Sequence, residues 1–389
     1  MNTNHLTLPC PPCEAERRTA GSSIVLASSS RQLSTTGSAV RPRRGQKGST
    51  TVAVAISMVA VVSATALVID IGNLKVIEAE LQTVADLAAK SAAQELARVY
   101  ISEGREDPLT DTLTATEKFR ISDAADRRAR INSAGGTSIV LPGSDVTIGK
   151  WNDQSGAFEA ATYGVNAVQV TARRDETSNG IVNMFFAGVF GTEGVPVQAG
   201  AASRLSGIRY LPKGTADFPV AIAKAWYAAH ASPCTTGNKL TFHPTGSAQG
   251  CVGWHTFEKT PANAAELKSI VKGLRLGTFV SPEIDITKST FEFTGGTLSS
   301  VLGEVMDLYN AKKNAKNELP VLIPVYDRDD CSNPSGPIRI LGVARAVITH
   351  VDTGGDGRIE ARVQCDVLPL AESGGPDFGV LAGGPDLVR

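Results

Sequence analysis

The pattern of apolar and polar positions changes character near residue 70. From Ser49 to Ile69 the chain has no charge over 21 residues, about the length of a helix that crosses the hydrocarbon core of a bilayer. Beyond Asp70 apolar residues recur in steps of three and four, at Leu74, Ile77, Leu81, Val84, Ala88 and Ala92. That spacing predicts a helix with one apolar face. A segment with the composition of a membrane span thus continues without a break into an amphipathic helix. A helix from residue 49 to about 99 would be about 75 Å long.

The residues around the apolar segment predict its orientation. Four basic residues precede it, in RPRRGQK at 41–47. Because cytoplasmic flanks are rich in Lys and Arg, we expect a cytoplasmic amino terminus and export of the chain after Asp70. Residues 41–71 are interpreted as a basic flank and a single transmembrane anchor. A cleaved signal peptide is the alternative, since ATA at 64–66 has the small residues of a cleavage site. Two observations argue against cleavage: the leader would be long, and the apolar helical pattern continues beyond the cleavage site through Ile71.

Asp70 is the candidate functional acid of this boundary. At the expected edge of the bilayer its carboxylate can stay hydrated, so the simplest interpretation is a boundary charge. The alternative is that Asp70 pairs with another membrane subunit.

The pattern after the anchor predicts a domain of helices and antiparallel strands over residues 72–208. A second helix is expected at 112–133, ended by two glycines. The apolar run GIVNMFFAGVFG at 180–191 is too short to cross a membrane and is interpreted as a short packed helix. Strands are expected at 144–151, 157–163, 165–173 and 195–203.

Residues 211–370 are predicted to form a second α+β domain. TPANAAELKSIVKGL at 260–274 is expected to be a helix with Thr260 as N-cap and Pro261 at its first position. A further helix is expected at 297–315 and three strands at 319–327, 338–351 and 358–368. The acidic turn DTGGDG between the last two strands is interpreted as a hairpin, because a calcium loop of the helix–loop–helix kind needs helices on both sides.

The two ends of the chain are predicted to be unstructured. Residues 1–40 are rich in Ser, Thr and Pro and are interpreted as a disordered cytosolic tail. Residues 371–389 repeat GGPD and are interpreted as a flexible tail. The net charge is −1, but residues 1–48 hold seven basic and two acidic residues, which leaves a mildly acidic main body with no indication of a nucleic-acid partner.

Four cysteines follow the predicted anchor, at Cys234, Cys251, Cys331 and Cys365. An even number in an oxidising compartment favours two disulfides. Sequence proximity favours the pairs Cys234–Cys251 and Cys331–Cys365, among three possible pairings. The alternative is a zinc site made by Cys234, His243, Cys251 and His255, although neither pair has the short spacing of a zinc finger. The earlier Cys10 and Cys13 are expected to stay reduced.

Patterns of catalytic residues are not found. The sequence has no His-Glu-x-x-His motif, no phosphate-binding loop and no nucleophile elbow. We therefore expect neither enzymatic activity nor a bound cofactor or metal.

The segment from Gly48 to Ala97 resembles the amino-terminal region of TadG-like (TadE/TadG) proteins from tight-adherence, or Flp pilus, loci. The resemblance consists of a basic leader, Gly48, an apolar span, Asp70 with Gly72, and the helix LQTVADLAAKSAAQELA. It extends to about residue 205. Relatives that are cleaved carry a Glu shortly after the glycine, whereas here Ser-Thr-Thr-Val-Ala follows Gly48, which favours an uncleaved anchor.

The resemblance implies a structural role in pilus assembly. It implies a pilin-like helix on a sheet, anchored in the inner membrane with its carboxyl-terminal part in the periplasm, and partners among other pilus or secretion-system membrane subunits or pilins. The alternative function is a membrane-tethered adhesin or ligand-binding module, in which the domain at 211–370 does the binding.

Overall fold

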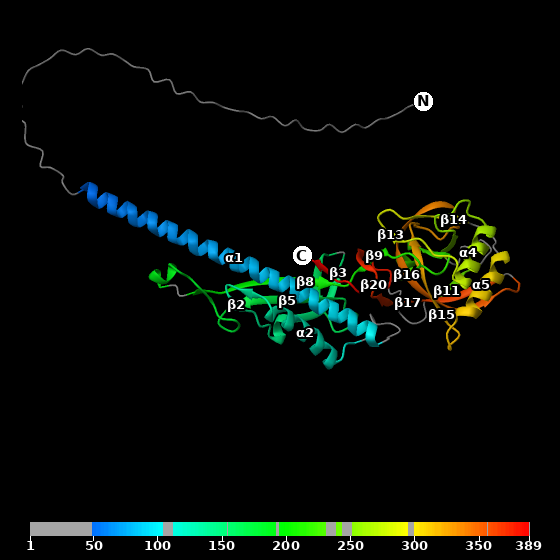
Figure 1. The fold of residues 1–389 in the computed structure, drawn as a ribbon, viewed down its shortest axis with the longest axis horizontal. Coiled ribbons are helices and arrows are strands. Elements are labelled where there is room, and N and C mark those ends of the chain that lie inside the picture. Colours follow the sequence, from blue (N-terminus) through cyan, green and yellow to red (C-terminus); the bar gives the residue numbers. More distant parts are fainter. Residues whose placement is uncertain are drawn as a thin grey trace, which may run out of the picture. The chain divides into compact units, whose positions relative to one another are not determined.

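The computed structural model describes residues 49–103, 112–153, 155–191, 194–230, 239–242, 251–294, 299–355 and 357–388 (Figure 1). The predicted tail at 1–40, with Cys10 and Cys13, lies outside the described residues, as do Cys234 and His243. The chain divides into two compact units, Met1–Ser57 and Met58–Arg389. All the sheets lie in the second unit.

Helix α1 (Ser49–Glu103) continues through the predicted boundary at residue 70. It contains no proline and is rich in alanine, so nothing interrupts its ladder of backbone hydrogen bonds. In its first half the large apolar side chains are exposed, as for Met58 and Val62, each 67% exposed. In its second half Leu81 and Val84 are buried. The predicted long helix, apolar all round at first and with one buried face later, is confirmed.

Helix α2 (Ala115–Arg130) lies against α1. It begins with a capping box, in which the Thr114 N–H donates to the Glu117 carboxylate at 2.6 Å and the Glu117 N–H donates to Thr114 Oγ1 at 3.3 Å. The Ser91 hydroxyl of α1 donates to the Ala124 carbonyl of α2 at 3.1 Å. The helix predicted at 112–133 is confirmed, with slightly shorter bounds.

A five-stranded antiparallel sheet packs on these two helices, in the order β21–β8–β5–β3–β4. Alternate residues of β5, Val168, Val170 and Ala172, are buried and share one core cluster with the apolar face of α1. The four strands predicted before residue 205 correspond to four strands of this sheet and are confirmed. The strands of this sheet are β3 (Val146–Asn152), β4 (Ala157–Ala160), β5 (Ala167–Arg174), β8 (Val197–Arg204) and β21 (Asp386–Val388). Ahead of β3 lie the short pair β1 (Ser133–Ala134) and β2 (Thr137–Ser138) and the 3₁₀ turn η2 (Gly143–Asp145).

The described residues between β5 and β8 form a hairpin, which we call the finger (residues 175–191 and 194–196). It contains β6 (Val182–Asn183), the 3₁₀ turn η3 (Ala187–Phe190) and β7 (Gly194–Val195). Figure 1 shows it in green, extending from the sheet along α1 toward the amino-terminal end of that helix. The short packed helix predicted at 180–191 is wrong. Gly180 and Gly191 have positive φ, so the backbone leaves the right-handed helical region at both ends of the apolar run.

The second part of the chain is built around a larger sheet, in the order β11–β17–β16–β14–β12–β10–β15. Strand β15 pairs with β10 on one side and β16 on the other, so five of these strands close into a ring. The three strands predicted between 319 and 368 are confirmed, and so is the hairpin at DTGGDG, which joins β16 to β17. The strands are β10 (Val220–Ala223), β11 (Lys239–Phe242), β12 (Val252–His255), β14 (Thr290–Thr294), β15 (Leu319–Tyr326), β16 (Gly336–Asp352) and β17 (Arg358–Gln364).

The same part of the chain contains three helices, α3 (Lys224–Ala229), α4 (Ala264–Leu276) and α5 (Ser299–Lys312). Buried faces of α4 and α5 share a core cluster with the strands. The N-cap of α4 is Asn263, whose side-chain oxygen accepts from the Glu266 N–H at 2.9 Å, and not Thr260 as predicted. The mixed α+β fold class is confirmed.

The carboxyl-terminal residues are ordered strands, so the prediction of a flexible tail at 371–389 is wrong. A second small sheet contains β13 (Ile284–Asp285), β9 (Gly207–Leu211), β20 (Val380–Ala382) and β18 (Asp366–Leu368), and β19 (Glu372–Gly375) also pairs with β9. Strand β21 then pairs with β8. Backbone pairing needs no apolar side chain, and small glycines allow close approach, which is why the composition of this segment hides its strands.

Candidate functional site

The carboxylate of Asp70 binds the finger. It accepts hydrogen bonds from three consecutive backbone N–H groups, from Phe185 at 2.9 Å, Phe186 at 3.0 Å and Ala187 at 2.8 Å. The side chain is only 1% exposed, which differs from the hydrated boundary charge expected from the sequence. Its partners are amides of the same chain, while pairing with another subunit stays a prediction. A carboxylate that accepts three N–H groups fixes the finger to α1. We call these three hydrogen bonds the clasp.

Arg174 holds the base of the finger. Its guanidinium donates to the carbonyls of Gly180 and Ile181, both at 3.2 Å, and to the carbonyl of Ala134 at 3.2 Å. The side chain is 9% exposed, and its N–H groups are paired with backbone carbonyls inside the fold. A Cβ on Gly135 would meet this guanidinium and Ile77 of α1, which explains a glycine at that turn.

The turn at the start of the finger is ordered by Asp175. Its Oδ1 accepts from the hydroxyl of Thr177 at 2.7 Å and from the N–H groups of Thr177 and Ser178, each at 2.8 Å. The hydrogen bond from the Thr177 hydroxyl is the main reason that the pKa of Asp175 lies below its usual value. The finger is thus fixed at its base by Arg174 and Asp175 and near its tip by Asp70.

The tip of the finger exposes apolar rings. Phe185 is 72% exposed and Phe186 is 41% exposed, although their backbone N–H groups are bound to Asp70. On α1, Ile69 and Ile71 flank Asp70 and are each 48% exposed. Exposed apolar groups from two segments therefore surround a buried carboxylate. Such an arrangement provides an exposed apolar surface.

The cysteines pair differently from the prediction. Cys251 is bonded to Cys331, which excludes both Cys234–Cys251 and Cys331–Cys365. Cys365 is fully buried and is also disulfide-bonded. The order of strands explains the error. Cys251 lies 80 residues before Cys331 in sequence, but β12, which follows Cys251, lies in the same sheet as the strands on either side of Cys331.

The zinc alternative loses two of its ligands in this arrangement. The sulfur of Cys251 is used in the disulfide. His255 is fully buried beside the rings of Phe257 and Phe291, and its Nδ1 accepts from the Phe257 N–H at 3.2 Å. Among the residues that the structure describes, no group of three or more His, Cys, Asp or Glu side chains is arranged to hold a metal ion.

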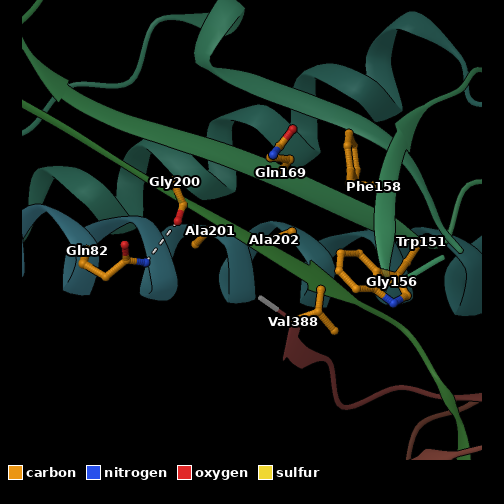
Figure 2. A pocket seen from close by; sticks show the side chains of 9 residues that line it. All are labelled: Gln82, Trp151, Gly156, Phe158, Gln169, Gly200, Ala201, Ala202 and Val388. Carbon is orange, nitrogen blue, oxygen red and sulfur yellow. Dashed lines mark hydrogen bonds between the residues drawn. The ribbon is translucent and has the colours of Figure 1, made fainter. Parts of the chain in front are cut away.

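A cavity of about 510 Å³ lies over one face of the five-stranded sheet, from β4 to β8, and reaches the edge where β21 joins β8 (Figure 2). The Gln82 amide of α1 donates to the Gly200 carbonyl at 3.0 Å across this edge. Its described lining consists of small residues, two amide side chains and two aromatic rings, without an ionisable group: Gln82, Trp151, Gly156, Phe158, Gln169, Gly200, Ala201, Ala202 and Val388. These groups can pack and hydrogen-bond, but they supply no acid, base or thiol.

Family comparisons agree with the first half of this architecture. Residues 77–202 match the family described as "Putative Tad-like Flp pilus-assembly". Residues 48–95 match the family described as "Putative Flp pilus-assembly TadE/G-like". The chain carries a TadE/TadG-like pilus-assembly region. The predicted resemblance is thereby confirmed, and it supports a role as a component of pilus assembly that interacts with other pilus components. Comparison with curated proteins and with solved structures found no match.

Within the TadE/TadG-like region the two matches overlap on α1 and include Asp70, Arg174 and the finger. Sequence reasoning selected Asp70 but not its partners. The local sequence carried no signal for Arg174 either, because it is the last residue of β5 and follows another arginine, Arg173. Nothing in the local sequence linked residues 185–187 to Asp70, which lies more than 100 positions earlier.

Proposed function

We propose that the chain is a single-pass, membrane-anchored structural component of a Flp (Tad) pilus assembly apparatus. In this proposal the amino terminus is cytoplasmic, residues 49–69 cross the inner membrane and the rest lies in the periplasm. The observation that carries it is α1, whose charge-free residues 49–69 expose their large apolar side chains while its second half is the spine of a folded domain. A helix with an exposed apolar surface on all sides needs an apolar solvent.

Two further features support the exported location. The basic residues at 41–47 precede the span, as expected for a cytoplasmic flank. The Cys251–Cys331 disulfide belongs to an oxidising compartment rather than to the bacterial cytoplasm. Both features lie outside the segment that crosses the membrane, so they support the orientation independently.

Reporter fusions test the orientation. A periplasm-dependent phosphatase fused after residue 388 of the otherwise intact chain is expected to be active, and the same enzyme fused at Lys47 is expected to be inactive. A cytoplasm-dependent fluorescent reporter should give the reverse pattern. Activity of the phosphatase only at Lys47 would end the proposed topology.

The disulfide gives a second test on the unfused protein. In intact cells, alkylation without reductant should leave Cys251 and Cys331 unmodified, and alkylation after reduction should label both. Mass spectrometry of the peptides reads the two states. Labelling of both thiols before reduction would contradict the periplasmic location of this domain.

Anchoring is tested by the apolar span itself. Wild-type protein should stay with the membrane fraction after alkaline washing. The double variant Val59→Arg/Val62→Arg places two charges at the centre of the span and should be released or degraded, because charged residues are costly there. The matched variant Arg127→Ala/Arg128→Ala, on the exposed side of α2, should behave as wild type. Co-purification from the native host then identifies which pilus or secretion subunits accompany the protein.

A further inference from the structure

We propose that the tip of the finger lies in the interfacial region of the bilayer, with the Phe185 and Phe186 rings in contact with lipid beside the point where α1 leaves the membrane. This inference rests on the proposed function, because it requires α1 to cross a bilayer. It goes further by assigning a second membrane contact, which comes from a segment more than 100 residues away from the span.

The depth of the tip follows from Asp70. The charge-free stretch ends at Ile69 after 21 residues, which at 1.5 Å per residue is about the thickness of the hydrocarbon core. Asp70 is the next residue, so it lies where the helix leaves the hydrocarbon. The Phe185 N–H is 2.9 Å from Asp70 Oδ1. The backbone of the tip is therefore at the level of the lipid headgroups and the first acyl carbons.

The chemistry of the tip fits this level. From Gly180 to Gly191 the chain has no Asp, Glu, Lys or Arg. Polar backbone groups are costly near hydrocarbon unless they are paired. Asp70 pairs three N–H groups of the tip, and the same bonds offset the burial of its own charge. The clasp thus lets a non-helical backbone and a carboxylate lie side by side at the membrane surface.

Lipid is the occupant that the apolar surface favours. The Phe185 backbone is hydrogen-bonded to Asp70, which lies between the exposed Ile69 and Ile71 of α1, so the exposed rings of the tip and the exposed end of the span lie at the same level of the helix. Ala66, one helical turn earlier, is 8% exposed although the neighbouring Leu67 and Val68 are 55% and 68% exposed. One side of the last turn of the span is therefore covered by protein, while the remaining sides face the same medium as the rings.

Depth-dependent fluorescence quenching tests this placement on the full-length protein in phosphatidylcholine/phosphatidylglycerol vesicles. An environment-sensitive probe is attached at Phe185→Cys in a Cys10→Ser/Cys13→Ser background, and the labelled background protein is subtracted. Vesicles contain nitroxide lipids with the spin label either near the headgroup or deep in the acyl chain. We expect a blue-shifted probe at position 185 that the shallow nitroxide quenches several-fold more than the deep one.

Two matched positions make the outcomes separable. Val59→Cys, at the centre of the span, should be quenched mainly by the deep nitroxide, and Phe119→Cys, on an α2 residue that is 69% exposed, should be quenched by neither. Quenching at position 59 without quenching at position 185 overturns the finger contact and leaves the anchor intact. Quenching at neither position overturns the anchor itself. A blue shift at 185 that grows with protein concentration and persists without lipid assigns the rings to a second copy of the chain, and this also overturns the proposal.

The clasp is tested by Asp70→Asn, which replaces one acceptor oxygen by an N–H donor that faces other donors. This variant should lose most of the shallow quenching at position 185 and keep the deep quenching at position 59. Undiminished quenching at 185 would show that Asp70 does not hold the finger at the membrane. Circular dichroism and the thermal midpoint of the variant show whether the domain is still folded when the probe is read.

Discussion

His255 is a titratable side chain that the fold keeps neutral. It is fully buried among Phe257, Phe291 and Phe293. Burial penalises the charged imidazolium and lowers the pKa of His255 to about 3, from 6.5. Since its Nδ1 accepts from the Phe257 N–H, the remaining proton is assigned to Nε2. The ring therefore serves as a core residue that happens to be ionisable, and not as a ligand or a base.

This burial predicts a pH dependence of stability. Because the folded pKa is the lower one, the unfolded chain takes up the proton first as the pH falls below 6.5, and stability is lost down to about pH 3. The slope from this one group approaches about 1.4 kcal/mol per pH unit. In His255→Asn, which keeps an acceptor near the position of Nδ1 and cannot titrate there, that component of the slope should vanish.

The comparison of the two proteins isolates this effect from other buried acids. Burial raises the pKa of Asp217 and of Asp377, so these carboxyls act in the opposite direction, toward greater stability as the pH falls. Denaturant unfolding curves at several pH values, for wild type and variant, give the difference directly. Equal slopes between pH 6.5 and 4 would contradict a buried neutral His255.

Gly207 marks a close approach of two backbone segments. A Cβ at this position would overlap the carbonyl group of Pro376, which follows β19. Gly207→Ala must therefore push the carboxyl-terminal strands away from β9, at a cost of about 1–3 kcal/mol or more. Gly384→Ala is the matched control, because nothing lies within 4 Å of its added Cβ. Thermal unfolding measures both, and equal midpoints would refute the close contact.

At the scale of elements, α1 is joined to α2 by an ion pair in addition to the Ser91 hydrogen bond and the apolar packing. Arg120 of α2 donates to Glu95 of α1 from Nη2 at 2.8 Å and from Nε at 3.1 Å. Glu95 is only 8% exposed, and its other oxygen pairs with Arg98 at 3.4 Å. The contact adds a directional restraint to the apolar packing of the two helices.

Removing this contact should be costly. Arg120→Ala leaves a nearly buried carboxylate with a weaker partner, so we expect a loss of about 1–3 kcal/mol in the free energy of unfolding. Arg127→Ala removes an exposed pair with Asp123 one turn along the same helix and should change it by about 0.5 kcal/mol or less. Chemical denaturation of the two variants provides the comparison. A similar small effect for both would mean that Glu95 is solvated in solution.

At the scale of the whole second unit, the chain returns to its first sheet at its end. Strand β21 pairs with β8 through Ala202, Ser203 and Arg204, and the Asp386 carboxylate accepts from Ser206 at 2.6 Å. Val367 and Leu381, from the last part of the chain, belong to the core cluster beneath the first sheet. The part after residue 207 is therefore joined to the helix-and-sheet part by a strand as well as by the covalent link.

Deleting residues 384–389 should loosen this junction. The backbone amides of β8 at 202–204 should exchange hydrogen faster, because they lose the neighbouring strand, whereas amides of β15 should be unchanged. Leu387→Ser is the matched variant: its side chain is 42% exposed, so the strand should stay paired and exchange should match wild type. Mass-spectrometric hydrogen exchange reads both regions, and unchanged exchange at 202–204 after the deletion would restore the flexible-tail interpretation.

The sequence by itself determined those features that depend on neighbours along the chain. Periodicity determined α1, α2 and the long strands, because each helix turn or strand pleat repeats locally. The charge-free stretch and Asp70 were visible for the same reason, and they led to the family that the comparisons support. Only the tertiary structure decided which distant segments meet. It paired Cys251 with Cys331, closed β15 onto β16, recruited a glycine-rich tail as strands and brought residues 185–187 to Asp70. These contacts use backbone groups or single side chains, which leave no periodic trace in the sequence.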